Sequence, residues 1–364
     1  MSRKKIFSLL TLGLLLVFTS SIAIAGSLEE TLRKMAKDNA KLYVKPLANA
    51  FGCAINSGWY HSASTHKLLG FDISLKIAAV PIPDEEKSFE FVVSDFSQTV
   101  QIGGQDYTLS LDGETLYPER NVPTVFGADK NTYVEKADVE GITQLFTQQL
   151  IDQGMSSEVV NSEEVQNQLH DIAYNIPDLG PIKGFDLDYF PLPIPQISLG
   201  LGIPMSPIKA EIVARGLPNL EIKDFGEIKT FGGGIKLRLD PFVPIPMFPL
   251  RITAGAFMQN LSLGDILEST HSHFSILVGR DVNFLLFGAG LYAGYGIESS
   301  SYEVSYDYEI SSGEVQHIEF KMDGDNESRI ILGGKIKFSL LNISIEYAKG
   351  YYDIYTAGVG ISFR

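Results

Sequence analysis

The residues best suited to chemistry lie in one short run, His271-Ser272-His273-Phe274-Ser275. Alternate side chains of a β-strand share a face, so His271, His273 and Ser275 would point the same way. A histidine near a serine hydroxyl can activate a nucleophile, and two histidines can ligate a metal. No third metal ligand is apparent. We interpret these residues as polar positions at a strand end, and we expect no enzyme activity, no metal site and no cofactor.

Two other motifs have the composition of a ligand site without its spacing. Asp323-Gly324-Asp325-Asn326-Glu327 is acidic, but it lacks the alternating ligands, the glycine at position six and the distant glutamate of a calcium loop. The glycine run Phe231-Gly232-Gly233-Gly234 has no helix after it, as a phosphate-binding loop would. We predict an acidic surface turn for the first motif and relief of crowding within a strand for the second.

The distribution of charge is more informative than these motifs. The 364-residue chain has a formal net charge of −15, which argues against a nucleic-acid partner because such a protein needs a basic face. Basic residues nevertheless gather on one face of the predicted strands. Two interpretations stay open: the cations pair with acidic neighbours, or they create a field that favours anionic solutes. The candidate residues of this lumen charge are Lys76, Lys236, Arg238, Arg251, Lys335 and Lys337, with Lys209 and Arg215 beside them.

These residues belong to ten segments in which apolar and polar side chains alternate. The segments start near residues 70, 196, 208, 228, 248, 272, 284, 329, 341 and 352. They run for about ten residues, the length of a tilted transmembrane strand, and one face mixes charges with glycine as a wet lumen does. Aromatic residues suited to interfacial girdles lie near their ends: Phe248, Tyr295, Tyr347, Tyr351, Tyr352, Tyr355 and Phe363.

The alternation predicts an all-β fold, a transmembrane antiparallel β-barrel at residues 70–364. We predict about 10–12 strands within a range of roughly 8–14, because residues 88–110 could add a hairpin to the ten segments. A soluble sandwich or lipid-binding clamshell has the same alternation and remains the alternative.

The N-terminus has the pattern of a secretory signal peptide over residues 1–25. Arg3, Lys4 and Lys5 precede an apolar run over 6–18, and Ala23-Ile24-Ala25 predicts cleavage between Ala25 and Gly26. We therefore expect the mature protein in the cell outer membrane. Its partners would be outer-membrane lipid and the barrel-assembly machinery. The lone Cys53 excludes an internal disulfide and a zinc site made of cysteines.

Two segments lie outside the alternating pattern. Residues 26–69 would form a helical plug: three- and four-residue spacing predicts a helix over 28–44 that Pro46 ends, followed by the candidate plug and ligand residues Trp59, Tyr60 and His61. Residues 84–195 are too long for a simple loop, so we predict a cap over the barrel mouth. Short strands are expected over 89–111 and a helix over 139–151 within this partly helical insertion.

Two resemblances add to this interpretation. The stretch Asn56-Ser57-Gly58-Trp59-Tyr60-His61-Ser62-Ala63, with Gly70-Phe71-Asp72 and residues 81–87, resembles an uncharacterised family of outer-membrane-type proteins from Gram-negative bacteria. More loosely, the order of signal peptide, helix, strands and a C-terminal aromatic is similar to the long-chain fatty-acid outer-membrane transporters, although their Asn-Pro-Ala signature is absent.

The first resemblance implies location, and the second implies passive uptake of a small amphipathic or anionic solute. The alternatives are a structural outer-membrane barrel without transport and a soluble secreted lipid-binding β protein.

Overall fold

The computed structural model describes residues 31–33, 35–202, 209–222, 226–245, 248–264, 266–309 and 314–363. The predicted signal peptide and its cleavage site at Ala25 and Gly26 lie outside these residues. The chain forms two compact units, Glu85–Asp186 and the remainder on either side of it. In the part of the chain that the structure describes, no helix has the length and apolar character needed to cross a membrane.

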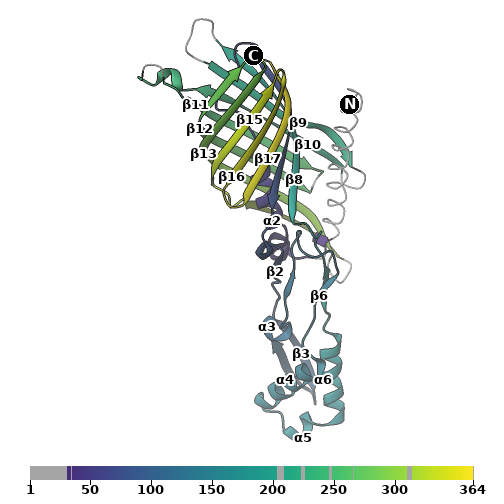
Figure 1. Cartoon of the computed structure of the whole chain (residues 1–364). Helices are drawn as coiled ribbons and strands as arrows, with labels where there is room; N and C mark the ends of the chain where they lie inside the picture. The colour runs from purple at the N-terminus through teal and green to yellow at the C-terminus, as the bar shows by residue number, and fades with distance from the viewer. Residues whose placement is uncertain are drawn as a thin grey trace. The chain divides into compact units, whose positions relative to one another are not determined.

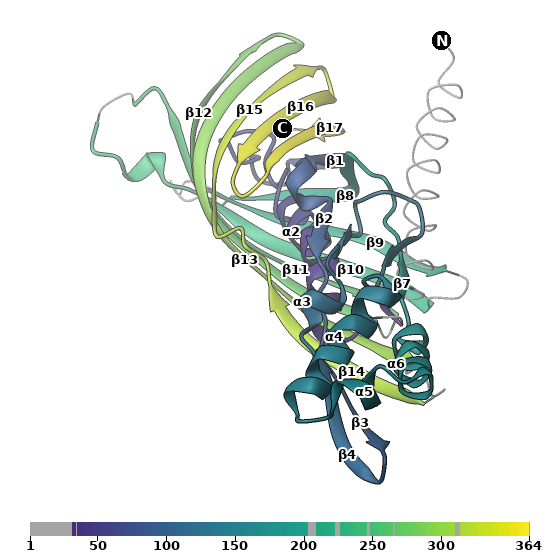
Figure 2. The same ribbon diagram turned by 90° about the horizontal axis from the view of Figure 1, so that it is seen from below.

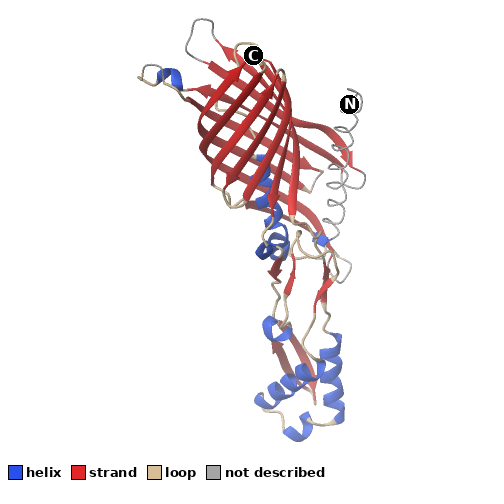
Figure 3. Ribbon diagram, in the orientation of Figure 1, coloured by secondary structure: helices blue, strands red, loops and turns tan. Residues whose placement is uncertain are grey.

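The larger unit is a closed antiparallel β-barrel of ten strands, which confirms the predicted fold (Figures 1 and 3). Each strand pairs with its neighbour in the chain, and the last strand returns to the first, from Phe71↔Phe363 to Ala79↔Tyr355. The strands are β1 (Phe71–Pro81), β8 (Tyr189–Gly202), β9 (Lys209–Ile222), β10 (Gly226–Arg238), β11 (Arg251–Leu263), β12 (Leu267–Phe284), β13 (Phe287–Glu309), β15 (Ser328–Phe338), β16 (Leu341–Lys349) and β17 (Asp353–Phe363).

The burial of side chains alternates along each strand with period two. In β1 the inward residues Asp72, Ser74 and Lys76 are buried, whereas the outward Ile73 is 55% exposed. An apolar exterior around a polar interior reverses the order of a soluble protein and is typical of a transmembrane barrel. The large exposed apolar residues include Ile197, Ile212, Ile276, Leu291, Ile330, Ile343, Ile345 and Ile361.

One further strand, β14 (Val315–Asp323), pairs with the second half of β13, beyond the stretch of β13 that pairs with β15. Helix α2 (Lys37–Ile55) precedes β1, and its carbonyl groups accept hydrogen bonds from inward side chains of the barrel. A short 3-10 helix, η2 (Asp240–Phe242), follows β10.

Residues 28–30 of the predicted helix over 28–44 lie outside the described residues, and the rest of its bounds are wrong, because α2 begins at Lys37 and runs through Pro46 to Ile55. A proline within a helix removes one backbone hydrogen bond and costs about 3 kcal/mol. The helix tolerates this loss because it is buried on several faces: Tyr43, Ala50 and Cys53 are fully buried. Tertiary packing therefore overrides the local signal.

The smaller unit, Glu85–Asp186, contains three two-stranded sheets and four helices among its described elements. Its core includes Leu109, Phe146, Leu150 and Leu169. The hairpin that could have given a twelve-stranded barrel forms a sheet of its own here, so that alternative is wrong. Whether this unit caps the barrel stays a prediction.

The elements of the smaller unit are η1 (Asp84–Glu86) at its start, β2 (Ser88–Glu90), β3 (Phe96–Ile102), β4 (Gln105–Leu111), α3 (Gly113–Leu116), β5 (Asn121–Pro123), β6 (Thr132–Val134), α4 (Val139–Asp152), α5 (Ser157–Val160), α6 (Glu163–Asn175) and β7 (Leu179–Ile182).

Candidate functional site: the plugged lumen

Residues 56–70, which we call the plug loop, join α2 to β1 and are fastened to several strands of the barrel. The Gly58 N–H donates to Glu346 Oε1 of β16 (2.9 Å), and Ser62 Oγ donates to Asp281 Oδ2 of β12 (2.6 Å). Thr253 Oγ1 of β11 donates to the Ala63 carbonyl (2.6 Å). The loop therefore lies inside the lumen and contacts separate parts of its wall.

The predicted plug residues Trp59, Tyr60 and His61 are all buried. Trp59 stacks on Phe257 with ring centroids 4.4 Å apart, and the Arg215 guanidinium lies 3.6 Å from the Trp59 ring. A cation this close to an indole face gives a favourable cation–π contact. Tyr60 Oη lies 3.0 Å from Ser275 Oγ. A Cβ at Gly255 would collide with the Tyr60 hydroxyl, so the wall needs glycine there.

Burial determines the protonation of two titratable side chains inside the barrel, His61 of the plug loop and Cys53 of α2. Desolvation lowers the pKa of His61 well below its usual range, and the charges of Lys335, Lys236 and Lys76 lower it further. The imidazole of His61 is therefore neutral at physiological pH. On the last turn of α2, burial raises the pKa of the Cys53 thiol to about 12, so this thiol stays protonated and unreactive in the folded protein.

Most of the predicted lumen cations contact a neighbouring wall side chain. Lys236 pairs with Glu211 (2.7 Å) and Lys335 with Asp281 (3.1 Å), while Lys76 donates to Ser344 Oγ (2.9 Å). At one end of the barrel Asp240 of η2 accepts from Arg238 Nε (2.9 Å) and Arg251 Nη1 (3.0 Å). Lys337 is half-buried on β15. These contacts correspond to the pairing interpretation and leave a weaker positive field than the sequence pattern suggests.

The catalytic-looking run lies within β12 and faces the lumen, so its placement at a strand end is wrong. β12 begins at Leu267, five residues before the predicted start. His271 is held between Ser300 Oγ (2.9 Å) and Ser269 Oγ (3.0 Å), and His273 lies 3.3 Å from Glu298. These contacts give the two histidines structural partners in the wall.

The acidic turn at 323–327 lies at the surface as expected, because Asp323, Asp325 and Glu327 are exposed, and it also contacts helix α2. Asp325 accepts from Lys45 Nζ (2.7 Å) and Asn49 Nδ2 (2.9 Å). One expectation about the girdle needs correction, because Tyr352 is buried. Of the other predicted girdle residues, Tyr295, Tyr351, Tyr355 and Phe363 are exposed, and Phe248 and Tyr347 are half-buried. Tyr352 lies in the connection between β16 and β17.

The barrel wall divides between β8 and β9. These strands pair from Gly202↔Lys209 to Gln196↔Arg215 and no further in the described chain. Beyond this point residues 189–195 of β8 pair with β1, and residues 216–222 of β9 pair with β10. In Figures 1 and 2, the end of β9 and the start of β10 lie away from β8. The hydrogen-bonded wall is therefore open along this stretch.

A cavity of about 900 Å³ lies at this division and reaches both faces of the wall. Its lining includes Gln196 and Arg215, which are buried in the lumen, and Ile73, Ile197 and Phe231, which are exposed on the apolar exterior. The cavity thus joins a polar interior with an apolar surface. A molecule with one polar and one apolar end matches such a lining.

Sequence reasoning did not single out the residues that organise this region. Arg215 belongs to the predicted lumen set, but its contact with Trp59 joins residues far apart in the chain. The division between β8 and β9 had a weak signal: the predicted strand near 196 begins seven residues after β8 does at Tyr189, because Pro191, Pro193 and Pro195 interrupt its pattern. Proline lacks the N–H of a ladder hydrogen bond, so these prolines favour an unpaired edge.

Fold and lumen together define a class: a β-barrel whose interior is occupied by a helix and loop that precede its first strand. Residues 3–363 match a family of unknown function (DUF6588), and the chain belongs to that family. No protein with a curated description matches it.

Two solved structures are similar to part of the chain. The beta domain of the Bordetella autotransporter BrkA is 12% identical with a TM-score of 0.23, over 47% of this chain and 90% of that one. Ail, the attachment invasion locus protein of Yersinia pestis, is 12% identical with a TM-score of 0.22, over 43% and 97%.

Proposed function

We propose that the protein is an outer-membrane barrel for passive uptake of small amphipathic carboxylates, which pass between the lumen and the lipid at the division of β8 from β9. The apolar exterior supports a location in a membrane, because outward residues such as Ile343 and Ile345 would otherwise face water. The observation that carries the proposal is the cavity of about 900 Å³ lined from both faces of the wall.

Arg215 is the residue we assign to the carboxylate of the solute. Its Nε donates to Gln196 Oε1 (2.7 Å) and its Nη1 to the Ile55 carbonyl (3.2 Å), which fixes the guanidinium plane. The remaining Nη2 is buried and has no hydrogen-bond partner among the described residues. A guanidinium with a spare, desolvated donor is well suited to a carboxylate.

The plug determines the mechanism. Because the loop is bonded to β11, β12 and β16, the lumen is closed in this state and uptake requires the loop to move. A solute that binds Arg215 would compete for the groups that hold Trp59 and Ile55. Differential binding of this kind shifts a closed barrel toward an open one.

The experiment uses Trp59, the single tryptophan, as a donor of energy transfer to cis-parinaric acid, a fluorescent fatty acid. We expect saturable transfer in purified protein, weakened by Ala214→Phe, which fills the outer side of the cavity. Ala254→Phe is the matched control, because Ala254 shares the outward, half-buried setting but does not line this cavity.

Two outcomes contradict the proposal. Equal transfer in both variants and wild type would mean that the fatty acid binds elsewhere, and an absence of saturable transfer would favour a structural barrel. Recovery of the protein from lysed cells without detergent would instead support the soluble lipid-binding alternative.

A further inference from the structure

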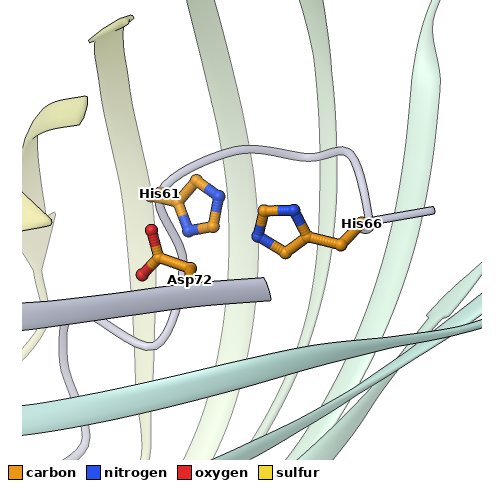
Figure 4. A group of neighbouring side chains, drawn as sticks. All are labelled: His61, His66 and Asp72. Carbon is orange, nitrogen blue, oxygen red and sulfur yellow. The ribbon is translucent and has the colours of Figure 1, made fainter. Parts of the chain in front are cut away.

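Two histidines of the plug loop and one carboxylate of the wall converge inside the barrel. His61 and His66 lie in the loop, and Asp72 is the second residue of β1. One ligand atom from each lies within 4.8 Å of the other two (Figure 4). This cluster is separate from Arg215 and from the histidines of β12.

Two of the three groups have an unused polar atom in a buried setting. His61 Nδ1 and Asp72 Oδ1 have no hydrogen-bond partner among the described residues, although His61 is only 4% exposed and Asp72 is fully buried. Leaving a buried polar atom unpaired is costly, so native structures rarely do it without a ligand or water. Both atoms belong to the types that bind metal ions.

We propose that His61, His66 and Asp72 bind a divalent transition metal, Zn²⁺ before others, with water as a further ligand. Two imidazoles and a carboxylate are the donor set of many zinc sites with an open position. Ligand atoms around a tetrahedral zinc lie about 3.4 Å apart, as bonds of about 2.0–2.1 Å require. Binding would therefore draw the three side chains closer together.

The surroundings orient the carboxylate and the loop. Asn342 Nδ2 of β16 donates to Asp72 Oδ2 (2.6 Å), which leaves Oδ1 available, and the His66 N–H donates to Glu211 Oε2 (2.9 Å). Such outer partners hold metal ligands in place.

Neighbouring lysines oppose a bound cation, but each has its own partner. Lys236 pairs with Glu211 (2.7 Å), Lys335 with Asp281 (3.1 Å), and Lys76 donates to Ser344 Oγ (2.9 Å). The charge of Lys76 also interacts with Asp72, but Asp72 Oδ1 has no hydrogen-bond partner among the described residues and is available to a metal.

A metal at this position would link the plug loop to β1 through coordinate bonds. The loop is otherwise held by hydrogen bonds and by the ring contacts of Trp59, so the metal would restrict its movement further. The site does not depend on solute uptake and would exist equally in a structural barrel.

The test is metal binding by tag-free, full-length protein in detergent after treatment with EDTA. Titration with Zn²⁺ by calorimetry and with Co²⁺ by visible absorption should give one metal per chain, the Co²⁺ bands indicating its coordination. Loss of a residue that only orients a metal ligand lowers metal affinity by ~10–100-fold, and we expect a loss of this size for Asn342→Ala. His66→Gln and Asp72→Asn remove a ligand, so each should lower the metal affinity by more than this.

His317→Gln is the matched control, because His317 forms an exposed His–Asp pair with Asp307 (3.0 Å) without a third ligand. It should retain wild-type affinity. Heat-modifiable gel mobility checks that each variant is folded. If Asp72→Asn does not fold, His66→Gln alone tests the metal site, since His66 is only half-buried and its substitution should be tolerated. Wild-type protein that binds neither metal, or folded His66→Gln with unchanged affinity, would overturn the proposal.

Discussion

Single residues in the lumen combine structural and binding roles, and Arg215 is the clearest case. Its guanidinium contacts Trp59 of the loop, Gln196 of β8 and the Ile55 carbonyl of α2. The alternating pattern places Arg215 on the lumen face, but no local signal links it to Trp59. Contacts between distant segments depend on the closed barrel and cannot be derived from periodicity.

We expect Arg215→Gln to destabilise the protein and change the emission of Trp59. The substitution removes a cation–π contact and leaves the Ile55 carbonyl unpaired, together about 1–3 kcal/mol. Urea unfolding in lipid vesicles, followed by Trp59 fluorescence, measures the loss. Arg215→Lys keeps the positive charge and should lower the free energy of unfolding by less. Equal losses in the two variants would show that the positive charge by itself does not stabilise the protein.

Cys53 should report on the closed state of the plug. Its thiol is buried and its pKa is raised to about 12, so at pH 7–8 a maleimide should not label folded protein. Denatured protein should be labelled fully. Rapid labelling of the native barrel, measured by mass spectrometry, would mean that α2 leaves the lumen readily.

Individual elements were predictable where their signal was local. Each barrel strand carries its own alternation, so the number of strands and their faces could be derived from residues such as Ile73, Lys76 and Ile343. The end of α2 could not be predicted from the sequence, because Pro46 normally ends a helix and the buried contacts of α2 keep this helix intact beyond it. We also expected the lumen to be filled with water. The surroundings of Gly360 do not fit this expectation, because a Cβ at this position would lie 2.6 Å from Ser74 Cβ. The side chains are therefore closely packed at that point of the wall.

The outward face of β16 provides a test of membrane insertion. Ile343→Arg should impair assembly, because a cation at the lipid midplane costs about 2–4 kcal/mol. Ile343 is 52% exposed, so packing within the protein does not explain such a loss. Ile343→Leu should assemble normally. The readout is the heat-modifiable fraction in outer-membrane preparations, and normal assembly of Ile343→Arg would argue against lipid on this face.

At the scale of the whole molecule, the larger unit is a barrel wall whose lumen side chains form hydrogen bonds with the plug loop and α2. Removal of residues 27–66 should leave a folded barrel with higher conductance in planar bilayers, because water replaces the plug around wall groups such as Glu346 and Asp281. Circular dichroism checks the fold of the deletion variant. Unchanged conductance would mean that the wall closes the lumen by itself.

The pairing of β1 with β17 has a consequence for assembly. Because the first barrel strand closes on the last, from Phe71↔Phe363 onward, the ring cannot be sealed until the whole chain has been translocated. The plug loop is covalently joined to β1, so the sealing step encloses the loop at the same moment. Pairing between such distant segments is slow. The plug loop must therefore already be compact when β1 pairs with β17. A chain that lacks this loop should form the closed barrel sooner.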